Sequence, residues 1–151
     1  TVMKGYWHQD EATARAIQDG WLHTGDMAVI NPEGDVYIKG RCKNMLLSAS
    51  GQNIYPEEIE SRLNNLPYVN ESLVIMCNEK LVALVYPDLG ESLKDGLDDH
   101  ALWRQIDISR QELNKELPPY SQITKVVLQN EEFEKTAKKS IKRYLYQNMN
   151  P

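Results

Sequence analysis

The chain is poor in the residues on which several classes of protein depend. Its 151 residues include two cysteines and three histidines. Cys42 and Cys77 show no CxxC spacing, which excludes a disulfide framework and makes a reducing cytoplasm the simplest compartment. His8, His23 and His100 are scattered and lack the spacing of metal ligands, so a zinc site is not expected.

Long apolar runs and an excess of positive charge are also missing. The longest apolar stretches, 73–76 and 81–86, are too short to span a bilayer, and no signal-peptide pattern opens the chain. The net charge of −5 argues against a nucleic-acid partner. A hydrophobic fraction of 41% and a charged fraction of 26% are typical of a folded globular domain. The nucleotide and metalloprotease motifs GxxxxGK[ST], GxGxxG and HExxH are absent.

Hydrophobic periodicity and turn residues predict a small α+β fold, in which a β-hairpin precedes a three-stranded sheet packed with helices. The turn signal at 31–35 joins two strands into the hairpin, and the runs at 73–76 and 81–86 form a second one. Asp10 is expected to cap the first helix and Pro67 to end the second. We expect helices at 10–17, 56–66 and 101–117, strands at 27–30, 36–39, 73–76, 81–86 and 123–128, a surface loop at 87–99, and a short basic helix at 141–146.

The most specific feature is a succession of glycine-punctuated turns that contains WLHTGD at 21–26, GRCK at 40–43 and GQNIYPEEIE at 51–60. A carboxylate held by a glycine turn, as at Asp26, can accept two hydrogen bonds from a ribose diol. The planar guanidinium of Arg41 suits hydroxyls or phosphate. Taken alone, a turn-capping aspartate and a surface ion pair would be the default interpretations, and their joint occurrence with the flanking pattern reverses that preference.

This succession closely resembles the stretch that links the large and small domains in the adenylate-forming superfamily, which includes acyl-CoA synthetases, luciferases and peptide-synthetase adenylation domains. The resemblance implies that Asp26 holds the ribose hydroxyls of ATP or of the acyl-adenylate, and that Arg41 assists. It also implies that Lys43 is the hinge about which the small domain rotates. Ser50 and Gly51 would line the CoA channel, although a simple tight turn remains the competing interpretation for this loop.

The tail carries five cations in a short segment, namely Lys135, Lys138, Lys139, Lys142 and Arg143. Such a run is usually a solvated face. Here it resembles the last motif of the superfamily, P-K-T-x-[ST]-G-K-[IV]-x-R, and better still the long-chain variant T-P-T-x-K-x-K-R, which hints at a long-chain fatty acyl substrate. Both alignments place the catalytic lysine at position 140, where this chain has Ser140. Serine carries no charge, so Lys139 is the candidate substitute.

The resemblance therefore implies the C-terminal part of an ATP-dependent fatty acid–CoA ligase, with residues 1–40 as the end of the large AMP-binding domain and 41–151 as the small lid domain. The start at Thr1 and the sequence that follows it are those expected of a piece of a longer chain, inactive alone. ATP, CoA and Mg²⁺ would be bound mainly by the large domain, and peripheral membrane contact stays open. Two alternatives remain: the lid of a peptide-synthetase-type adenylation domain, and a non-catalytic binding module that retains the fold.

Overall fold

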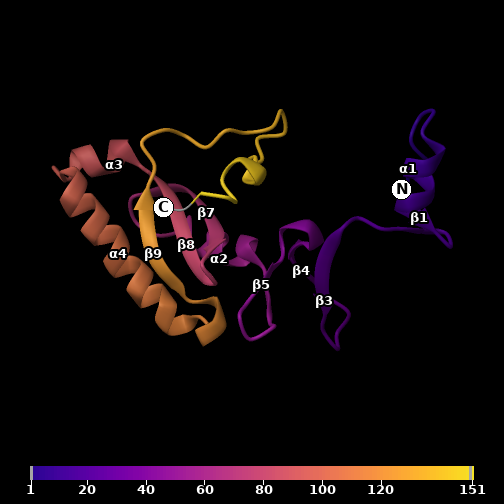
Figure 1. The fold of residues 1–151 in the computed structure, drawn as a ribbon, viewed down its shortest axis with the longest axis horizontal. Coiled ribbons are helices and arrows are strands. Elements are labelled where there is room, and N and C mark those ends of the chain that lie inside the picture. The colour runs from indigo at the N-terminus through magenta and orange to yellow at the C-terminus, as the bar shows by residue number, and fades with distance from the viewer. Residues whose placement is uncertain (1, 150) are drawn as a thin grey trace. The chain divides into compact units, whose positions relative to one another are not determined.

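A computed structural model describes residues 2–149 and 151, and the chain divides into two compact units, Thr1–Lys43 and Asn44–Pro151 (Figure 1). The first unit contains α1 (Asp10–Ala16), β1 (Ile17–Gln18), β2 (Trp21–Leu22), β3 (Asp26–Ile30) and β4 (Val36–Arg41). The predicted hairpin is confirmed, because β3 and β4 pair antiparallel across the turn at 31–35. Two details of the first helix were wrong. Gln9 occupies the N-cap position, and the helix ends at Ala16 because Ile17 turns into the extended conformation and pairs with Leu22.

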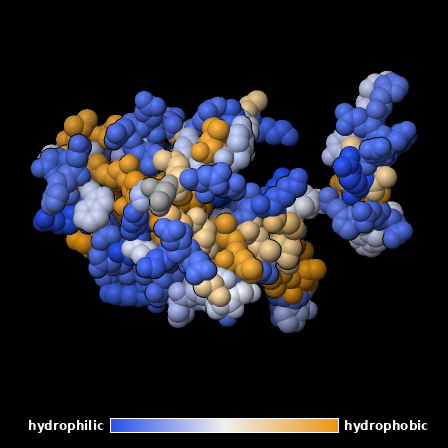
Figure 2. All heavy atoms as spheres, in the orientation of Figure 1, coloured by the Kyte–Doolittle hydropathy of each residue, from blue (hydrophilic) through white to orange (hydrophobic). Residues whose placement is uncertain are grey.

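The β3–β4 hairpin leaves apolar side chains in solvent. Val29, Ile30, Val36 and Ile38 are between 52% and 70% exposed, and apolar surface is visible over this part of the chain in Figure 2. Within the described residues 2–43, only Gly40 is buried. This unit therefore has no hydrophobic core of its own.

The second unit begins with short elements that lead into a helix. They are the 3₁₀ turn η1 (Cys42–Asn44), whose first two residues belong to the first unit, the paired strands β5 (Leu46–Leu47) and β6 (Asn53–Ile54), and α2 (Pro56–Leu63). Proline suits the first turn of α2, and the carboxylates of Glu57 and Glu58 favour the positive end of the helix dipole. The helix ends at Leu63 and not at Leu66 as predicted, since the chain leaves it through the tight turn 64–66.

The predicted three-stranded sheet is present, in the order β7 (Val69–Cys77), β8 (Lys80–Pro87) and β9 (Ile123–Leu128). Strands β7 and β8 pair antiparallel, and β9 runs parallel to β8. Asn78 and Glu79 both have positive φ in the two-residue connection, which is the geometry that matches the twist of a hairpin. Helix α3 (Leu89–Lys94) occupies part of the segment expected to be a loop. Its N-terminus is capped by Asp88, whose carboxylate accepts from the Glu91 N–H at 2.9 Å.

Both faces of this sheet are covered, which explains why its strands are nearly continuous apolar runs. On one face Val74, Ala83 and Val85 pack against residues of α2 and of α4 (Asp99–Glu116), among them Leu63 and Ile106. On the other face Leu73, Ile75, Val82 and Leu84 pack against Phe133, Ile141 and Tyr146 of the tail. The tail contains the 3₁₀ turn η3 (Arg143–Leu145) where a basic α-helix was expected.

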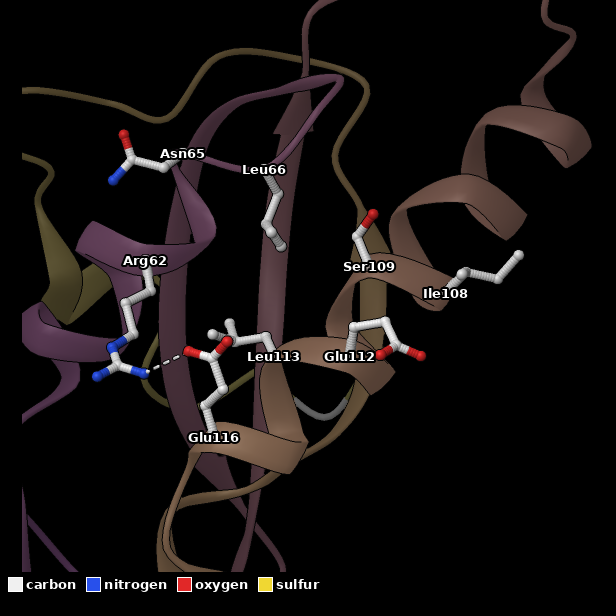
Figure 3. A pocket seen from close by; sticks show the side chains of 8 residues that line it. All are labelled: Arg62, Asn65, Leu66, Ile108, Ser109, Glu112, Leu113 and Glu116. Atoms are coloured by element: carbon white, nitrogen blue, oxygen red, sulfur yellow. Dashed lines mark hydrogen bonds and ion pairs between the residues drawn. The ribbon is translucent and has the colours of Figure 1, made fainter.

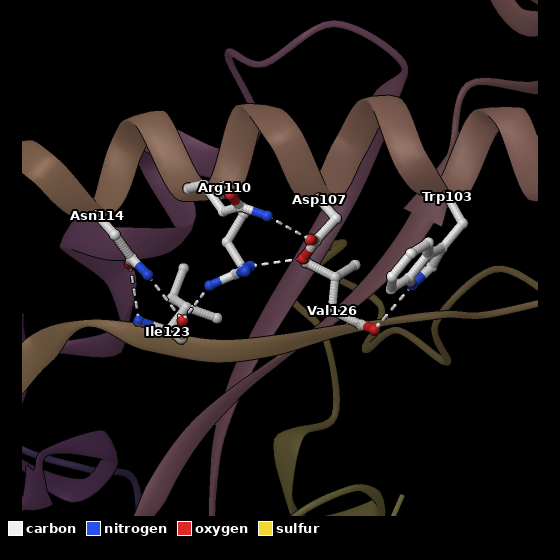
Figure 4. Close-up of polar contacts among 7 residues, drawn as sticks. Trp103, Asp107, Arg110, Asn114, Ile123 and Val126 are labelled. Atoms are coloured by element: carbon white, nitrogen blue, oxygen red, sulfur yellow. Dashed lines mark hydrogen bonds and ion pairs between the residues drawn. The ribbon is translucent and has the colours of Figure 1, made fainter.

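Helix α4 also binds the outer edge of the sheet through polar side chains (Figure 4). The amide of Asn114 donates to the Ile123 carbonyl at 2.8 Å and accepts from the Ile123 N–H at 2.9 Å. Arg110 donates to the same carbonyl at 2.6 Å, and the Trp103 indole N–H donates to the Val126 carbonyl at 3.3 Å. These bonds satisfy backbone groups that an edge strand would otherwise expose.

Candidate functional site

Asp26 and Arg41, which lie far apart in sequence, are brought together by the register of the β3–β4 hairpin. Their side chains form an ion pair of 2.8 Å between Arg41 Nη1 and Asp26 Oδ1, and the same nitrogen donates to the Thr24 carbonyl at 2.7 Å. Gly25, between Thr24 and Asp26, has φ of +76°, and a Cβ built on it would lie 3.8 Å from Arg41 Nη1. Both side chains are partly exposed, so the pair itself contributes no more than about 1 kcal/mol to stability. An acceptor-only carboxylate and a donor-only guanidinium thus stand side by side, which is a suitable set for hydroxyls that both donate and accept.

Lys43 is exposed in the turn η1 and is the last residue of the first compact unit. On the next residue, Asn44, the side-chain amide donates to Glu57 Oε1 at 2.5 Å, which ties the start of the second unit to the first turn of α2. The division between the two units thus falls inside η1.

Ser50 and Gly51 lie in one exposed turn between β5 and β6. The buried Ser48 organises it: its hydroxyl accepts from the Gln52 N–H at 2.9 Å and lies 3.0 Å from the Ser50 hydroxyl. Gly51 has φ of +78° and nothing stands within 4 Å of where a Cβ would be. The turn thus presents backbone groups without an overlying side chain.

Lys139 and Ser140 lie at the exposed tip of a small hairpin formed by the tail, in which Lys135 pairs with Ile141. The Thr136 N–H donates to the Ser140 carbonyl at 2.8 Å, and the Lys139 N–H donates to the Thr136 carbonyl at 2.9 Å. Residues 136–140 thus form a tight turn and not an extended strand. Lys139 has φ of +61°, the left-handed conformation that glycine adopts most readily. In the first of the two motifs quoted for the tail, P-K-T-x-[ST]-G-K-[IV]-x-R, glycine stands at this position.

The base of this hairpin, which we call the tail hairpin (133–143), is anchored to the sheet. Phe133 is 3% exposed and meets Tyr146 edge to face, and the Lys135 ammonium lies 2.5 Å from Glu71 on β7. Hydrogen bonding to Glu71 raises the pKa of Lys135, and the Glu134 carboxylate likewise raises the pKa of Lys142. Lys135 and Lys142, at the base, are therefore paired with carboxylates. Lys138 and Lys139 are exposed at the tip.

Sequence reasoning missed an ion pair between two residues of the quoted motifs. Arg143, which closes the tail motif, pairs with Glu60, which closes the GQNIYPEEIE segment. Both side chains are at least 86% buried. Burial raises the pKa of Glu60, and Arg143 opposes that shift. The sequence offered one signal for the burial of Glu60: it directly follows the apolar Ile59 on a short amphipathic helix.

A separate groove of about 410 Å³ lies between α2 and α4 (Figure 3). Arg62 and Glu116 point toward one another at its end and form an ion pair of 3.3 Å. None of the site residues predicted from sequence lines it.

Within residues 2–149 and 151, no group of three or more His, Cys, Asp or Glu side chains could hold a metal ion. No helix in the described part of the chain is long and apolar enough to cross a membrane.

Comparison with known proteins assigns the class. Residues 43–149 match the family model described as "AMP-binding enzyme C-terminal domain". The chain belongs to this family, whose members are parts of adenylate-forming enzymes.

Similar proteins with assigned activities are CoA ligases of several kinds. The chain is 46% identical over 74 residues to a feruloyl-CoA synthase of Amycolatopsis sp, and 47% identical over 74 residues to a long-chain-fatty-acid–CoA ligase of Mycobacterium tuberculosis. It is 40% identical over 100 residues to an indoleacetate–CoA ligase of Aromatoleum aromaticum. These matches cover 49%, 49% and 63% of this chain, and 15%, 14% and 19% of the relatives. The chain thus corresponds to a small part of their length.

Solved structures agree with the fold. The adenylation domain of a carboxylate reductase from Mycobacterium chelonae superposes with a TM-score of 0.82 at 23% identity, covering 94% of this chain and 24% of that one. The anthranilate CoA ligase AuaEII, solved in complex with anthranoyl-AMP, gives a TM-score of 0.73 at 29% identity and covers 93% of this chain and 26% of that one.

Proposed function

We propose that this chain is the C-terminal part of an ATP-dependent fatty acid–CoA ligase. In the first half-reaction a carboxylate oxygen of the acid attacks the α-phosphorus of ATP, and pyrophosphate leaves. In the second, the CoA thiol attacks the acyl carbon, and AMP leaves. The observation that carries the proposal is the family match over residues 43–149, together with the tail motif folded into a hairpin that presents its tip to solvent.

We assign Asp26 and Arg41 to the nucleotide. The Asp26 carboxylate would accept hydrogen bonds from the two ribose hydroxyls, and Arg41 would hold that carboxylate in place while donating to the same ligand. The partial exposure of both side chains leaves them accessible to a ligand of this kind. ATP and Mg²⁺ would be bound mainly by an upstream AMP-binding domain, to which residues 1–40 belong in this proposal, with 41–151 as the lid. The exposed apolar side chains of β3 and β4 are consistent with packing against such a domain.

Lys43 and the Ser50–Gly51 turn would serve the second half-reaction. Lys43 stands at the division between the two units, where a change in backbone angles would turn one against the other. The β5–β6 turn offers backbone groups with no Cβ at Gly51, so the pantetheine arm of CoA could pass close to them.

The substrate class is the least constrained element. The similarity of the tail to the long-chain variant of the motif supports a fatty acid, while the feruloyl-CoA and indoleacetate–CoA relatives make an aryl acid the main competitor. The cytoplasm fits the low cysteine content. A peptide-synthetase-type adenylation domain would be indicated by an adjoining carrier domain. A non-catalytic module would be indicated by the absence of adenylation, for which Ser140 is the motivating residue.

Adenylation is the step that tests the proposal, because the tail motif acts there. A preorganised cation at the reacting phosphate is typically worth about 10²–10³ in rate, and Ser140 supplies none. In the full-length enzyme, Ser140→Lys should therefore accelerate pyrophosphate release by about that factor. Thioester formation from a supplied acyl-adenylate should not change.

Lys139→Gly is the decisive companion variant, because it removes the ammonium while suiting the left-handed backbone. If Lys139→Gly abolishes adenylation and Ser140→Lys brings no gain, Lys139 is the catalytic residue and the register is shifted by one. If neither variant changes pyrophosphate release and acids are not activated at all, the enzyme assignment fails in favour of a binding module.

A further inference from the structure

The buried pair Glu60–Arg143 is attached to the backbone N–H and C=O of one residue of the sheet, Val74. Glu60 Oε1 accepts from the Val74 N–H at 2.7 Å, and Arg143 Nη1 donates to the Val74 carbonyl at 3.3 Å, while Arg143 Nη2 pairs with Glu60 Oε2. Val74 lies on β7, the edge strand opposite to β9. The two side chains therefore occupy the hydrogen-bonding positions that a further strand would have used, and they connect α2, β7 and the tail.

A buried ion pair adds little to the free energy of unfolding. Removing two charges from water is costly, and apolar replacements of a buried ion pair are often neutral or stabilising. What the pair does provide is a single geometry, because the planar guanidinium must meet both a carboxylate and a carbonyl at once. A buried pair of this kind fixes the direction in which the chain leaves it.

The chain that leaves it is the tail hairpin. Arg143 follows Ser140 by three residues, and the Lys142 N–H donates to the Glu134 carbonyl at 2.8 Å across the hairpin. The other arm is tied to the same strand through Lys135 and Glu71. Both arms are thus fixed to β7, and the residues between them, from Thr136 to Ser140, are exposed.

We propose that Glu60 and Arg143 are positioning residues, which hold the tip of the tail hairpin in the orientation that adenylation requires. The proposal rests on the proposed function for its catalytic consequence, but the anchoring of the hairpin is a property of this chain alone. Glu60 and Arg143 touch no reacting atom in this scheme. They act through the backbone between residues 136 and 143.

The test compares substitutions at the pair with a substitution at an exposed ion pair that also involves α2, in the full-length protein. Arg143→Met removes the guanidinium and keeps most of the side-chain volume, and Glu60→Gln keeps an acceptor for the Val74 N–H but removes the charge. Arg143→Lys keeps the positive charge but lacks the planar guanidinium that reaches Glu60 and the Val74 carbonyl through two separate nitrogens, so the tip should be anchored only in part. Arg62→Met is the control, because Arg62 is also on α2 and its ion pair with Glu116 is exposed.

Hydrogen exchange of peptides covering 133–143 reads the anchoring directly. We expect exchange about tenfold faster in Arg143→Met, an intermediate value in Arg143→Lys, and no change in Arg62→Met. The kcat for pyrophosphate release should fall about tenfold in Arg143→Met with KM for ATP unchanged, because only the orientation of the tip is lost. Thioester formation from a supplied acyl-adenylate should stay within about twofold.

The double variant Glu60→Met/Arg143→Leu separates positioning from stability. It removes both charges together and leaves no buried unpaired charge, so its thermal midpoint should fall less than that of Arg143→Met, while the tip loses its orientation and adenylation slows. Unchanged exchange in Arg143→Met would overturn the anchoring. Faster exchange with undiminished adenylation would overturn the positioning role. Faster exchange in a protein that activates no acid would instead refute the proposed function and leave the anchoring intact.

Discussion

Asn114 and Ile123 form a reciprocal pair, in which one side-chain amide satisfies both backbone groups of one edge-strand residue (Figure 4). The pair joins the last turns of α4 to the first residue of β9, and Arg110 adds a second donor to the same carbonyl. At the opposite edge, Glu60 accepts from the Val74 N–H and Arg143 donates to the Val74 carbonyl. Both edges of the three-stranded sheet are therefore closed by side chains from elsewhere in the chain.

Replacing Asn114 by Ala should destabilise the second unit by about 1–3 kcal/mol, since it leaves a partly buried N–H and C=O without their partner. Asn114→Asp should also lower the free energy of unfolding. Its carboxylate still accepts from the Ile123 N–H, but it has no donor for the Ile123 carbonyl and repels that oxygen. Chemical unfolding of each variant measures the effect, with Glu112→Ala on the exposed side of α4 as the control. Equal midpoints for Asn114→Ala and Glu112→Ala would contradict the edge-closing role.

Replacing Lys139 by Gly should stabilise the tail hairpin by up to about 1 kcal/mol, because a left-handed φ is costly for any residue with a Cβ. Lys138 is not among the residues with positive φ, so Lys138→Gly should have the opposite sign. Exchange rates of the hydrogen-bonded Thr136, Lys139 and Ser140 amides report on the hairpin without requiring global unfolding. Slower exchange in Lys138→Gly than in Lys139→Gly would refute the assignment of the turn.

Asp107 should make stability depend on pH at the acid end. Its hydrogen bond from Arg110, 2.7 Å long and largely buried, lowers the pKa of the carboxyl below its usual value. A lowered folded-state pKa means that the stabilisation is present above a pH of about 4 and is lost as the pH falls further, through the folded-state value. In Asp107→Asn that part of the dependence should disappear. The difference in unfolding free energy between the two proteins should therefore narrow below a pH of about 4. If the difference in unfolding free energy stays constant with pH, Asp107 does not contribute to the pH dependence of stability.

Replacing Lys43 by Pro should separate the two half-reactions in the full-length enzyme. Proline fixes φ and so restricts rotation at the boundary between the two units. Under the proposed function, thioester formation should then fall much more than adenylate formation, by about tenfold or more. Lys43→Ala is the control, because it removes the ammonium and leaves φ free. Equal losses in both half-reactions would argue against a hinge at this residue.

Much of the local structure follows from the sequence. The bounds of β9 were predicted to the residue, because the segment 123–128 is rich in β-branched residues, follows a proline pair and precedes polar residues. The two hairpins followed from their turn residues. The errors lie where the chain changes direction. The short helix α3 has few apolar residues to mark it, and α2 ends one turn early because the chain turns at Asn64 before Pro67 is reached.

For the candidate site, too, the sequence identified residues, whereas the structure was needed to show which of them are in contact. The resemblance to the adenylate-forming superfamily singled out seven residues, each of which lies in a short motif that the sequence shows directly: Asp26, Arg41, Lys43, Ser50, Gly51, Lys139 and Ser140. That Arg41 reaches Asp26 depends on the register of a hairpin, which the sequence predicts only in outline. That Arg143 meets Glu60, 83 residues away, depends on how the tail crosses the sheet. Local periodicity sets which face of an element is apolar, whereas the packing of distant elements sets which charged groups are buried together.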